Sequence, residues 1–203
     1  PPQKYVEKLF DDFSTKFDKT LKELNYKLPF IVNELIRGLD NNIIKYNKAI
    51  DLGCGTGLAG NDLRSICKNL TGIDLSKKML EEARKLKIYD NLIAGDIVKI
   101  LNSSSLSYDL FIALDVLIYI GEVGSIFKSV RERCNKNAIF IFSVEVQNND
   151  GYSLLKTGRY SHSESYILNN AFNLFKLKDS REVILRKEKG KNIDGKIFIF
   201  QAS

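Results

Sequence analysis

The chain has 203 residues, a length that suits one α/β domain with a well-buried core and is too short for two ordinary domains and a linker. Hydrophobic residues make up 44% and charged residues 28%, which excludes a disordered chain and a membrane-embedded one. The formal net charge is +6, but lysines alternate with acidic residues, so we interpret the charge as a solvated basic surface. We interpret the densest basic stretch, residues 186–191, in the same way. We therefore expect residues 1–203 to form one domain.

The sequence carries no signal for secretion or membrane insertion. No apolar run approaches the roughly 20 residues that cross a bilayer, and the first residues include the charged Lys4 and Glu7. The cysteines are Cys54, Cys67 and Cys134, an odd number at scattered spacing, unlike a disulfide framework or a zinc site. We expect a cytoplasmic protein without a membrane span or a metal centre.

The first 40 residues have helical periodicity. Apolar side chains recur at steps of three or four, at Tyr5, Leu9, Phe13, Phe17, Leu21 and Leu24. Pro29 is expected to begin a further helix with Phe30 and Leu35 on its apolar face. Residues 1–40 are therefore predicted to be a helical N-terminal region that lies on another surface.

From residue 48 onward, short apolar runs alternate with helix-like segments, which favours βαβ units and a parallel sheet. The runs are residues 49–52, 70–73, 92–94, 109–114 and 138–144. They are apolar at consecutive positions, as strands covered by helices on both faces should be. Residues 172–178, 183–186 and 196–201 are predicted to be strands of an antiparallel edge, separated by Asp179-Ser180 and a polar loop at residues 190–195.

A glycine-rich turn follows the first of these strands. The segment after Asp51-Leu52 reads Gly53, Cys54, Gly55, Thr56, Gly57 and leads into a helix. Glycine permits positive φ and lets a ligand approach the backbone, and the helix N-terminus offers free N–H groups. The turn is predicted to bind a polar ligand.

A dinucleotide site is the main alternative, because Gly55-Thr-Gly57-Leu-Ala-Gly60 matches GxGxxG. In that register Asp51 and Gly53 would have to lie inside a central strand, and in the register that begins at Gly53 the third glycine position is Leu58. A carboxylate at residue 51 would repel a pyrophosphate but attract the ammonium and sulfonium charges of S-adenosylmethionine. The charge therefore favours S-adenosylmethionine.

The next two strands also end in acids that suit an adenosine ligand. Asp74 can accept hydrogen bonds from both ribose hydroxyls. Asp96 can accept from an adenine amino group, with the N–H of Ile97 near a ring nitrogen, although a plain helix cap is an alternative for Asp96. Leu75 and Met79 are candidates for apolar contact to the base, and core packing is an equal alternative for Met79.

A fourth strand ends at Asp115. Acids at residues 51, 74, 96 and 115 would thus share the carboxyl edge of the sheet, where open α/β sheets bind their ligands. We group Asp115 with the cofactor-binding acids.

These segments resemble motifs one to five of the class I S-adenosylmethionine-dependent methyltransferases. They read AIDLGCGTGLAG, TGIDLSKKML, AGDIV, DLFIALDVLIYIG and AIFIFSVE, in the right order and spacing. The flanking segments YVEKLFDDFSTKFD and GRYSHSESYI are similar to the predicted methyltransferases that often follow tetratricopeptide repeats. The resemblance implies a Rossmann-like fold with a mostly parallel seven-stranded sheet, an antiparallel C-terminal strand, helices on both faces and a mobile N-terminal lid.

Candidate residues for the methyl acceptor come from three places, and they are Tyr119, Glu145, Arg159, Tyr160 and His162. His162 is the single histidine, and its ordinary pKa near 6.5 suits proton acceptance, although a structural role is also open. Ser161-His-Ser-Glu164 also reads as a helix cap, and Arg159 is either a clamp for an anion or a surface ion-pair partner.

Three functional hypotheses remain open. The first is an O- or N-methyltransferase that acts on a small molecule, such as a carboxylate. The second is a protein methyltransferase, and the third is a cofactor-binding module without catalysis. Nucleic-acid methylation loses support, because Asp115-Val-Leu-Ile-Tyr119 contains no proline and no cysteine lies where a carbon-methylating nucleophile is expected.

Overall fold

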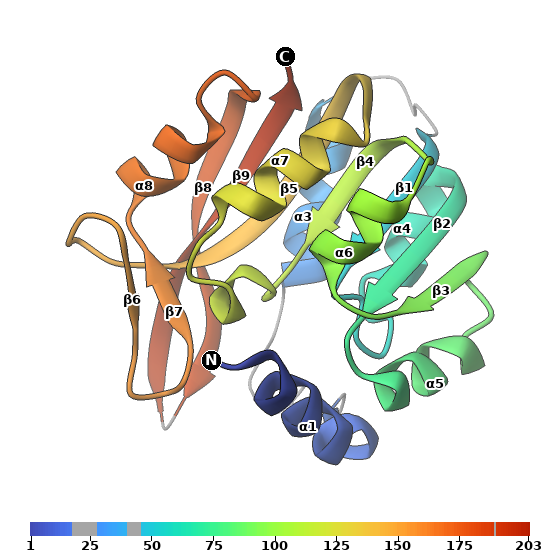
Figure 1. Ribbon diagram of the computed structural model, residues 1–203, viewed down its shortest axis with the longest axis horizontal. Helices are drawn as coiled ribbons and strands as arrows, with labels where there is room; N and C mark the ends of the chain where they lie inside the picture. The colour runs from blue at the N-terminus through green and yellow to red at the C-terminus, as the bar shows by residue number, and fades with distance from the viewer. Residues whose placement is uncertain (18–27, 40–45, 189) are drawn as a thin grey trace.

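The structure is a computed structural model that describes residues 1–17, 28–39, 46–188 and 190–203 (Figure 1). A nine-stranded mixed sheet forms its centre, with helices on both faces, which confirms the predicted α/β class. The strands are β1 (Tyr46–Leu52), β2 (Cys67–Asp74), β3 (Asn91–Ala94), β4 (Tyr108–Ala113), β5 (Cys134–Val146), β6 (Tyr152–Leu154), β7 (Tyr160–His162), β8 (Phe175–Glu188) and β9 (Lys191–Ala202). The helices are α1 (Gln3–Phe13), η1 (Ser14–Lys16), α3 (Leu28–Leu39), α4 (Gly60–Ile66), α5 (Lys77–Lys85), α6 (Ile97–Ser103), η2 (Leu117–Tyr119), α7 (Gly124–Glu132) and α8 (Glu164–Ala171).

The strand order is β3-β2-β1-β4-β5-β7-β6, and β9 pairs antiparallel with both β5 and β8. The sheet branches at β5. One edge of β5 pairs parallel with β4 and then with β7, and its other edge pairs antiparallel with β9. Seven strands were expected and nine are present, because the short hairpin of β6 and β7 has no periodic pattern in the sequence.

The C-terminal strands are longer than predicted. Residues 172–178 and 183–186 were expected as separate strands, whereas β8 is one continuous strand. Asp179 lies at a register shift that follows Leu177, and a second shift separates Ile184 from Arg186. A bulge lets a strand take up an extra residue without ending, so Asp179-Ser180 bends β8 instead of terminating it.

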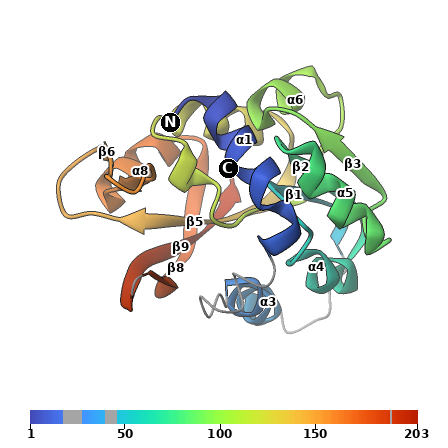
Figure 2. The same ribbon diagram turned by 90° about the horizontal axis from the view of Figure 1, so that it is seen from below.

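Two apolar layers enclose the sheet. Ile50, Phe111 and Phe140 face one layer, and their chain neighbours Ala49, Leu110 and Ile139 face the other. The first layer packs against α6, α7 and α8, and the second against α3 and α4, as the two views of the ribbon show (Figures 1 and 2). The strands are therefore apolar at consecutive positions because helices cover both faces of the sheet, as predicted.

The N-terminal region divides into two parts. α1 and η1 lie across the carboxyl edge of the sheet, near α5 (Figure 2). α3 instead belongs to the second apolar layer, with Leu28, Val32 and Leu35 buried. Phe30 was expected on the buried face but is 62% exposed, because the buried stripe of α3 starts at Leu28 and continues at steps of four and three.

Leu21 and Leu24 lie outside the described residues. Within the described ranges, no helix has the length and apolar character needed to cross a membrane.

Candidate functional site

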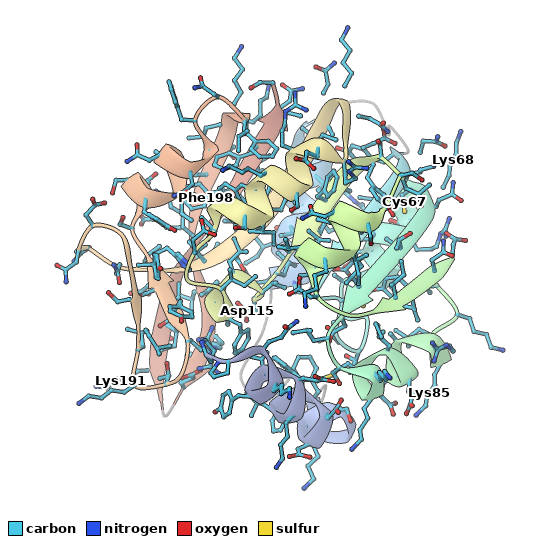
Figure 3. All side chains as sticks on the ribbon, in the orientation of Figure 1. Cys67, Lys68, Lys85, Asp115, Lys191 and Phe198 are labelled. Carbon is cyan, nitrogen blue, oxygen red and sulfur yellow. The ribbon has the colours of Figure 1, made fainter. Side chains whose placement is uncertain are left out.

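A cavity of about 450 Å³ lies at the carboxyl edge of β1, β2 and β4, beneath α1. Asp115, at the end of β4, lies between the sheet and α1 (Figure 3). The cavity has a glycine-turn wall, a wall of strand-end acids, an apolar cover from α1 and a charged end. Of the predicted cofactor residues, those that line it are Asp51, Gly53, Cys54, Gly55, Asp74, Leu75, Asp96, Ile97 and Asp115.

The glycine turn is held against β2. The N–H groups of Gly53 and Cys54 both donate to the carbonyl of Ile73, at 2.7 and 2.9 Å. Gly53 has φ +73°, and a Cβ there would lie 2.3 Å from the Cγ2 of Val116. Gly55 has φ +54°, and a Cβ there would meet only Phe17, at 3.7 Å. Gly53 is therefore required by packing, whereas Gly55 leaves backbone open to the cavity.

Gly57 and Thr56 complete the turn but do not line the cavity. Gly57 has φ +91°, and a Cβ there would lie 2.9 Å from Leu86 and 3.1 Å from Tyr89. Thr56 is buried. These two residues support the turn from behind, and their contact with a ligand stays a prediction.

Asp74 connects β2 to the turn. Its Oδ2 accepts from the N–H of Gly55 at 2.8 Å, and its Oδ1 accepts from the N–H of Ser76 at 2.9 Å. Burial raises the pKa of Asp74, and the backbone N–H groups of Ser76, Gly55 and Leu75 oppose that shift. A carboxylate has about four acceptor sites, so Asp74 keeps acceptor capacity for a ligand beside these backbone donors.

Asp51 is buried and paired with a residue that the sequence analysis missed. The hydroxyl of Tyr89 donates to Oδ2 of Asp51 at 2.8 Å. Burial raises the pKa of Asp51 to about 7, and the hydrogen bond from Tyr89 opposes the shift. Tyr89 lies in the loop before β3, where no periodic pattern marks it as a partner of β1.

Asp96 and Ile97 begin α6 at the cavity wall. Asp96 accepts from the N–H of Lys99 at 2.9 Å, which confirms the helix-cap alternative, and it also accepts from the side chain of Gln3 at 3.1 Å. Met79 is fully buried in α5 and does not line the cavity. Its position agrees with the core-packing alternative.

α1 covers the cavity with apolar side chains. Phe10 packs edge-on against Tyr119, with ring centroids 5.3 Å apart. Leu9 and Phe13 line the cavity while remaining 39% and 37% exposed. The helix is tied to the sheet edge because the hydroxyl of Ser76 donates to Asp11 at 2.5 Å. This arrangement suits a cover that closes on a ligand.

The charged end of the cavity centres on Arg186. Its Nη2 lies 2.7 Å from Glu145, its Nε lies 2.7 Å from Glu188, and Arg159 pairs with the same oxygen of Glu188. Arg186 is 3% exposed, so the interpretation of residues 186–191 as a solvated surface is wrong at this position. The register shift before Arg186 lets both Leu185 and Arg186 be buried, although neighbours in a regular strand face opposite sides.

Asp115 adjoins this cluster. It has φ +55°, and its N–H donates to the hydroxyl of Ser143 at 2.9 Å. Its Oδ2 lies 3.8 Å from Nη1 of Arg186. Burial raises the pKa of Asp115 to about 6, and the charges of Arg186 and Arg159 oppose the shift.

The predicted acceptor residues separate into two groups. Tyr119 and Arg159 line the cavity, whereas Glu145, Tyr160 and His162 do not. Burial raises the pKa of Tyr119, and the adjacent Arg159 opposes that rise. Glu145 reaches the site only through its ion pair with Arg186.

His162 is fully buried behind the cavity wall. Its Nε2 lies 2.9 Å from the carbonyl of Ile120 and 3.2 Å from that of Gly121, so Nε2–H donates to this loop. Burial lowers the pKa of His162 and favours the neutral ring. Tyr160 packs edge-on against Tyr152, at 5.8 Å between centroids. Ser163 caps α8 by accepting from the N–H of Tyr166, as the cap alternative predicted.

Residues 50–142 match the protein family described as "Methyltransferase domain". This stretch of the chain is therefore a methyltransferase domain. Solved structures that share its fold hold S-adenosylmethionine or S-adenosylhomocysteine.

Curated relatives match parts of this methyltransferase domain. An uncharacterized methyltransferase of Schizosaccharomyces pombe is 31% identical over 84 residues, which cover 41% of this chain and 31% of the relative. A ubiquinone biosynthesis O-methyltransferase of Nitrosomonas europaea is 27% identical over 139 residues, which cover 66% of this chain and 57% of the relative. The matches thus span between about a third and three fifths of these relatives.

Solved structures share the fold over almost the whole methyltransferase domain. The magnesium protoporphyrin IX methyltransferase of Synechocystis PCC 6803, solved with bound S-adenosylhomocysteine, superposes with a TM-score of 0.74 at 19% identity and covers 99% of both chains. An S-adenosylmethionine-dependent methyltransferase of Clostridium acetobutylicum superposes with a TM-score of 0.70 at 18% identity, over 96% of this chain and 99% of that one.

Proposed function

We propose that this chain transfers the methyl group of S-adenosylmethionine to an oxygen or nitrogen atom of a small molecule. The observation that carries the proposal is a pair of carboxylates beside a glycine turn on one cavity wall, the buried Asp51 and the half-buried Asp74. A buried carboxylate attracts a cation and repels a pyrophosphate, so this wall suits an ammonium-bearing and sulfonium-bearing cofactor better than a dinucleotide.

The residues around the turn fit the separate parts of the cofactor. Asp51 faces its amino-acid end, and the remaining acceptor capacity of Asp74 serves its ribose hydroxyls. Gly55 lets the cofactor lie against the backbone because no Cβ intervenes. Asp96, the N–H of Ile97 and the side chain of Leu75 bound the space for the adenine. Bound there, the cofactor supplies an activated methyl group on a sulfonium.

The cavity volume of about 450 Å³ lies within the usual range of about 300–1,000 Å³ for small-ligand pockets. The apolar face of α1, including Phe10 and Phe13, would exclude water while Tyr119 and Arg159 orient the acceptor. In an in-line methyl transfer, alignment of the two reactants and exclusion of water supply most of what the protein contributes.

Two observations favour a small acceptor. The acceptor end lies under α1 and is bounded by buried or half-buried side chains such as Tyr119, Arg159 and Arg186. Two relatives are also named for small-molecule chemistry, the ubiquinone biosynthesis O-methyltransferases of Nitrosomonas europaea and Pelagibacter ubique. A protein chain would have to enter the same covered space.

The test is incubation with S-adenosylmethionine labelled in the methyl group, against a metabolite extract and, separately, a protein extract. The proposal expects label in the small-molecule fraction, and an Asp74→Ala variant should lose it. Label found only in protein would contradict the proposed acceptor. Cofactor binding without transfer to either fraction would indicate a binding module without catalysis.

A further inference from the structure

Two neighbouring side chains at the charged end of the cavity, Asp115 and Arg186, each carry a buried polar atom without a partner among the described residues. Nη1 of Arg186 lies 3.8 Å from Oδ2 of Asp115, which is beyond hydrogen-bond distance. Within the described ranges, Nη1 of Arg186 and Oδ1 of Asp115 have no hydrogen-bond partner. Unpaired buried polar atoms are costly and uncommon. Asp115 and Arg186 both line the cavity, so a ligand group that reaches these two atoms when the side chains move would serve both.

The remaining charges of the cluster are already paired. Arg186 uses Nη2 for Glu145 and Nε for Glu188, and Arg159 pairs with Glu188. Two guanidinium groups therefore face three carboxylates, and Asp115 is the carboxylate without a cation at hydrogen-bond distance. A further carboxylate in this end would add to the excess of negative charge, so the geometry disfavours the carboxylate acceptor considered from the sequence.

The missing group must donate one hydrogen bond and accept another. An ammonium has no lone pair for Nη1 of Arg186, and an ionised carboxylate has no proton for Oδ1 of Asp115. A hydroxyl group supplies both, because its O–H donates while its oxygen accepts. Of these three acceptor groups, the pair of orphan atoms therefore favours the hydroxyl.

The surroundings of this pair suit an apolar, flat acceptor. Phe10 and Tyr119 meet edge-on at 5.3 Å, and Ile118 and Ile120 line the same cavity. Such walls bind the body of an aromatic compound, and the polar pair fixes its orientation.

We propose, building on the proposed function, that Asp115 and Arg186 hold the hydroxyl group of a phenol-type acceptor. Asp115 takes the phenolic proton through Oδ1, and Arg186 donates from Nη1 to the phenolic oxygen. A new bond forms between that oxygen and the methyl carbon of the cofactor. The methyl–sulfur bond breaks and its electron pair stays on sulfur, which leaves a neutral thioether, a methyl ether and a protonated Asp115.

The acidity of the partners agrees with this assignment. A phenol, like the tyrosine side chain, has a pKa near 10. Burial brings the pKa of Asp115 up to about 6, with Arg186 and Arg159 lowering it and Glu145 and Glu188 raising it. The raised pKa of Asp115 reduces the difference between its pKa and that of the phenol. The remaining difference disappears as methyl transfer proceeds, because the phenolic proton becomes more acidic. Asp115 was predicted to bind the cofactor, whereas its contacts favour the acceptor.

One test sorts acceptors by class. The whole chain is incubated with labelled S-adenosylmethionine and separate panels of phenols, aliphatic alcohols, carboxylic acids and amines. The inference expects methyl ethers from the phenol panel, and at least about a hundredfold slower transfer in Asp115→Asn, as is typical for loss of a general base. Products from the acid or amine panels alone, or none from the phenols while the cofactor binds, would overturn the inference. No cofactor binding would overturn the proposed function itself.

A binding test needs no turnover. The chain is saturated with S-adenosylhomocysteine and titrated at pH 7.5 with 2-naphthol and with naphthalene, which differ only in the hydroxyl. 2-Naphthol should bind at least about tenfold more tightly than naphthalene, because a charge-assisted hydrogen bond contributes at least that much. This preference should be lost in Asp115→Asn and in Arg186→Lys. Arg186→Lys keeps a positive charge near Glu145 and Glu188, which protects the fold.

The exposed Asp194→Asn is the matched control and should retain the preference for 2-naphthol. Equal binding of the two compounds to the unmodified chain, or an unchanged preference in Asp115→Asn, would overturn the inference.

Discussion

Tyr89 donates a hydrogen bond of 2.8 Å to the buried carboxylate of Asp51, and it thereby joins the loop before β3 to the end of β1. The ring of Tyr89 also packs behind the glycine turn, since a Cβ on Gly57 would lie 3.1 Å from it and one on Gly60 would lie 2.7 Å from its hydroxyl. One side chain thus supports the turn and holds the carboxylate that we assign to the cofactor's cationic end.

Tyr89→Phe should lower the free energy of unfolding by about 1–3 kcal/mol at pH 8, because it leaves the ionised Asp51 buried without this donor. Urea denaturation measures the change. Tyr5→Phe, at a tyrosine that is 53% exposed, is the control and should change stability little. Equal stabilities for the two variants would show that the Tyr89 hydrogen bond contributes nothing.

Asp51→Asn should stabilise the cofactor-free chain at high pH while weakening the cofactor. The pKa of Asp51 is about 7 in the folded chain against 3.8 as its ordinary value, so the folded chain binds the proton more tightly. Folding stability attributable to Asp51 therefore falls as pH rises from about 4 to about 7 and stays low above that.

Asp51→Asn removes this ionisation, so its stability minus that of the unmodified chain should be larger at pH 8 than at pH 4. The increase should reach up to about 4 kcal/mol, because each unit of pKa shift corresponds to about 1.4 kcal/mol. Denaturation curves at both pH values test this. A difference between the two chains that does not vary with pH would contradict the buried titration.

Gly53→Ala should mainly reduce stability, whereas Gly55→Ala should mainly reduce cofactor affinity. Both residues have positive φ, which costs about 1 kcal/mol for alanine. The Cβ at residue 53 would also lie 2.3 Å from Val116, whereas that at residue 55 faces the cavity. We expect Gly53→Ala to lose at least about 2 kcal/mol more stability than Gly55→Ala, and Gly55→Ala to lose cofactor affinity while folded. Similar denaturation midpoints for both would contradict this division of roles.

His162→Ala should destabilise the chain by about 2 kcal/mol, because the carbonyls of Ile120 and Gly121 lose their donor. Burial lowers the pKa of His162 below 6.5, so the unfolded chain binds the proton more tightly and stability falls as pH drops through about 6.5. His162→Ala should remove this acid-side loss while leaving S-adenosylhomocysteine affinity within about twofold. An unaltered pH dependence of unfolding would contradict the buried neutral ring.

The fold followed from local patterns in the sequence. Consecutive apolar residues in β1, β4 and β5 predict strands covered on both faces, and glycines before α4 predict a turn with positive φ, because both properties are local. The acids at 51, 74, 96 and 115 all reach the cavity, since parallel strands end at the same edge.

The charged end of the site could not be predicted in the same way. Arg186 lies 71 positions beyond Asp115 and is turned inward by a register shift that no periodicity marks. Tyr89 is a loop residue whose partner belongs to a strand 38 positions earlier. His162 carries the chemistry of a base but is placed behind the wall by the pairing of β7 with β5, a pairing that depends on tertiary structure.

The most direct test of the account is a calorimetric titration of the whole chain with S-adenosylmethionine, alongside NADH. The account predicts one site for S-adenosylmethionine and no binding of NADH. Asp74→Ala should weaken this site by about 1.5–3 kcal/mol, since it removes a charged hydrogen-bond acceptor, while Glu81→Ala at the exposed face of α5 should not. Absence of S-adenosylmethionine binding, or binding of NADH in its place, would contradict the central claim.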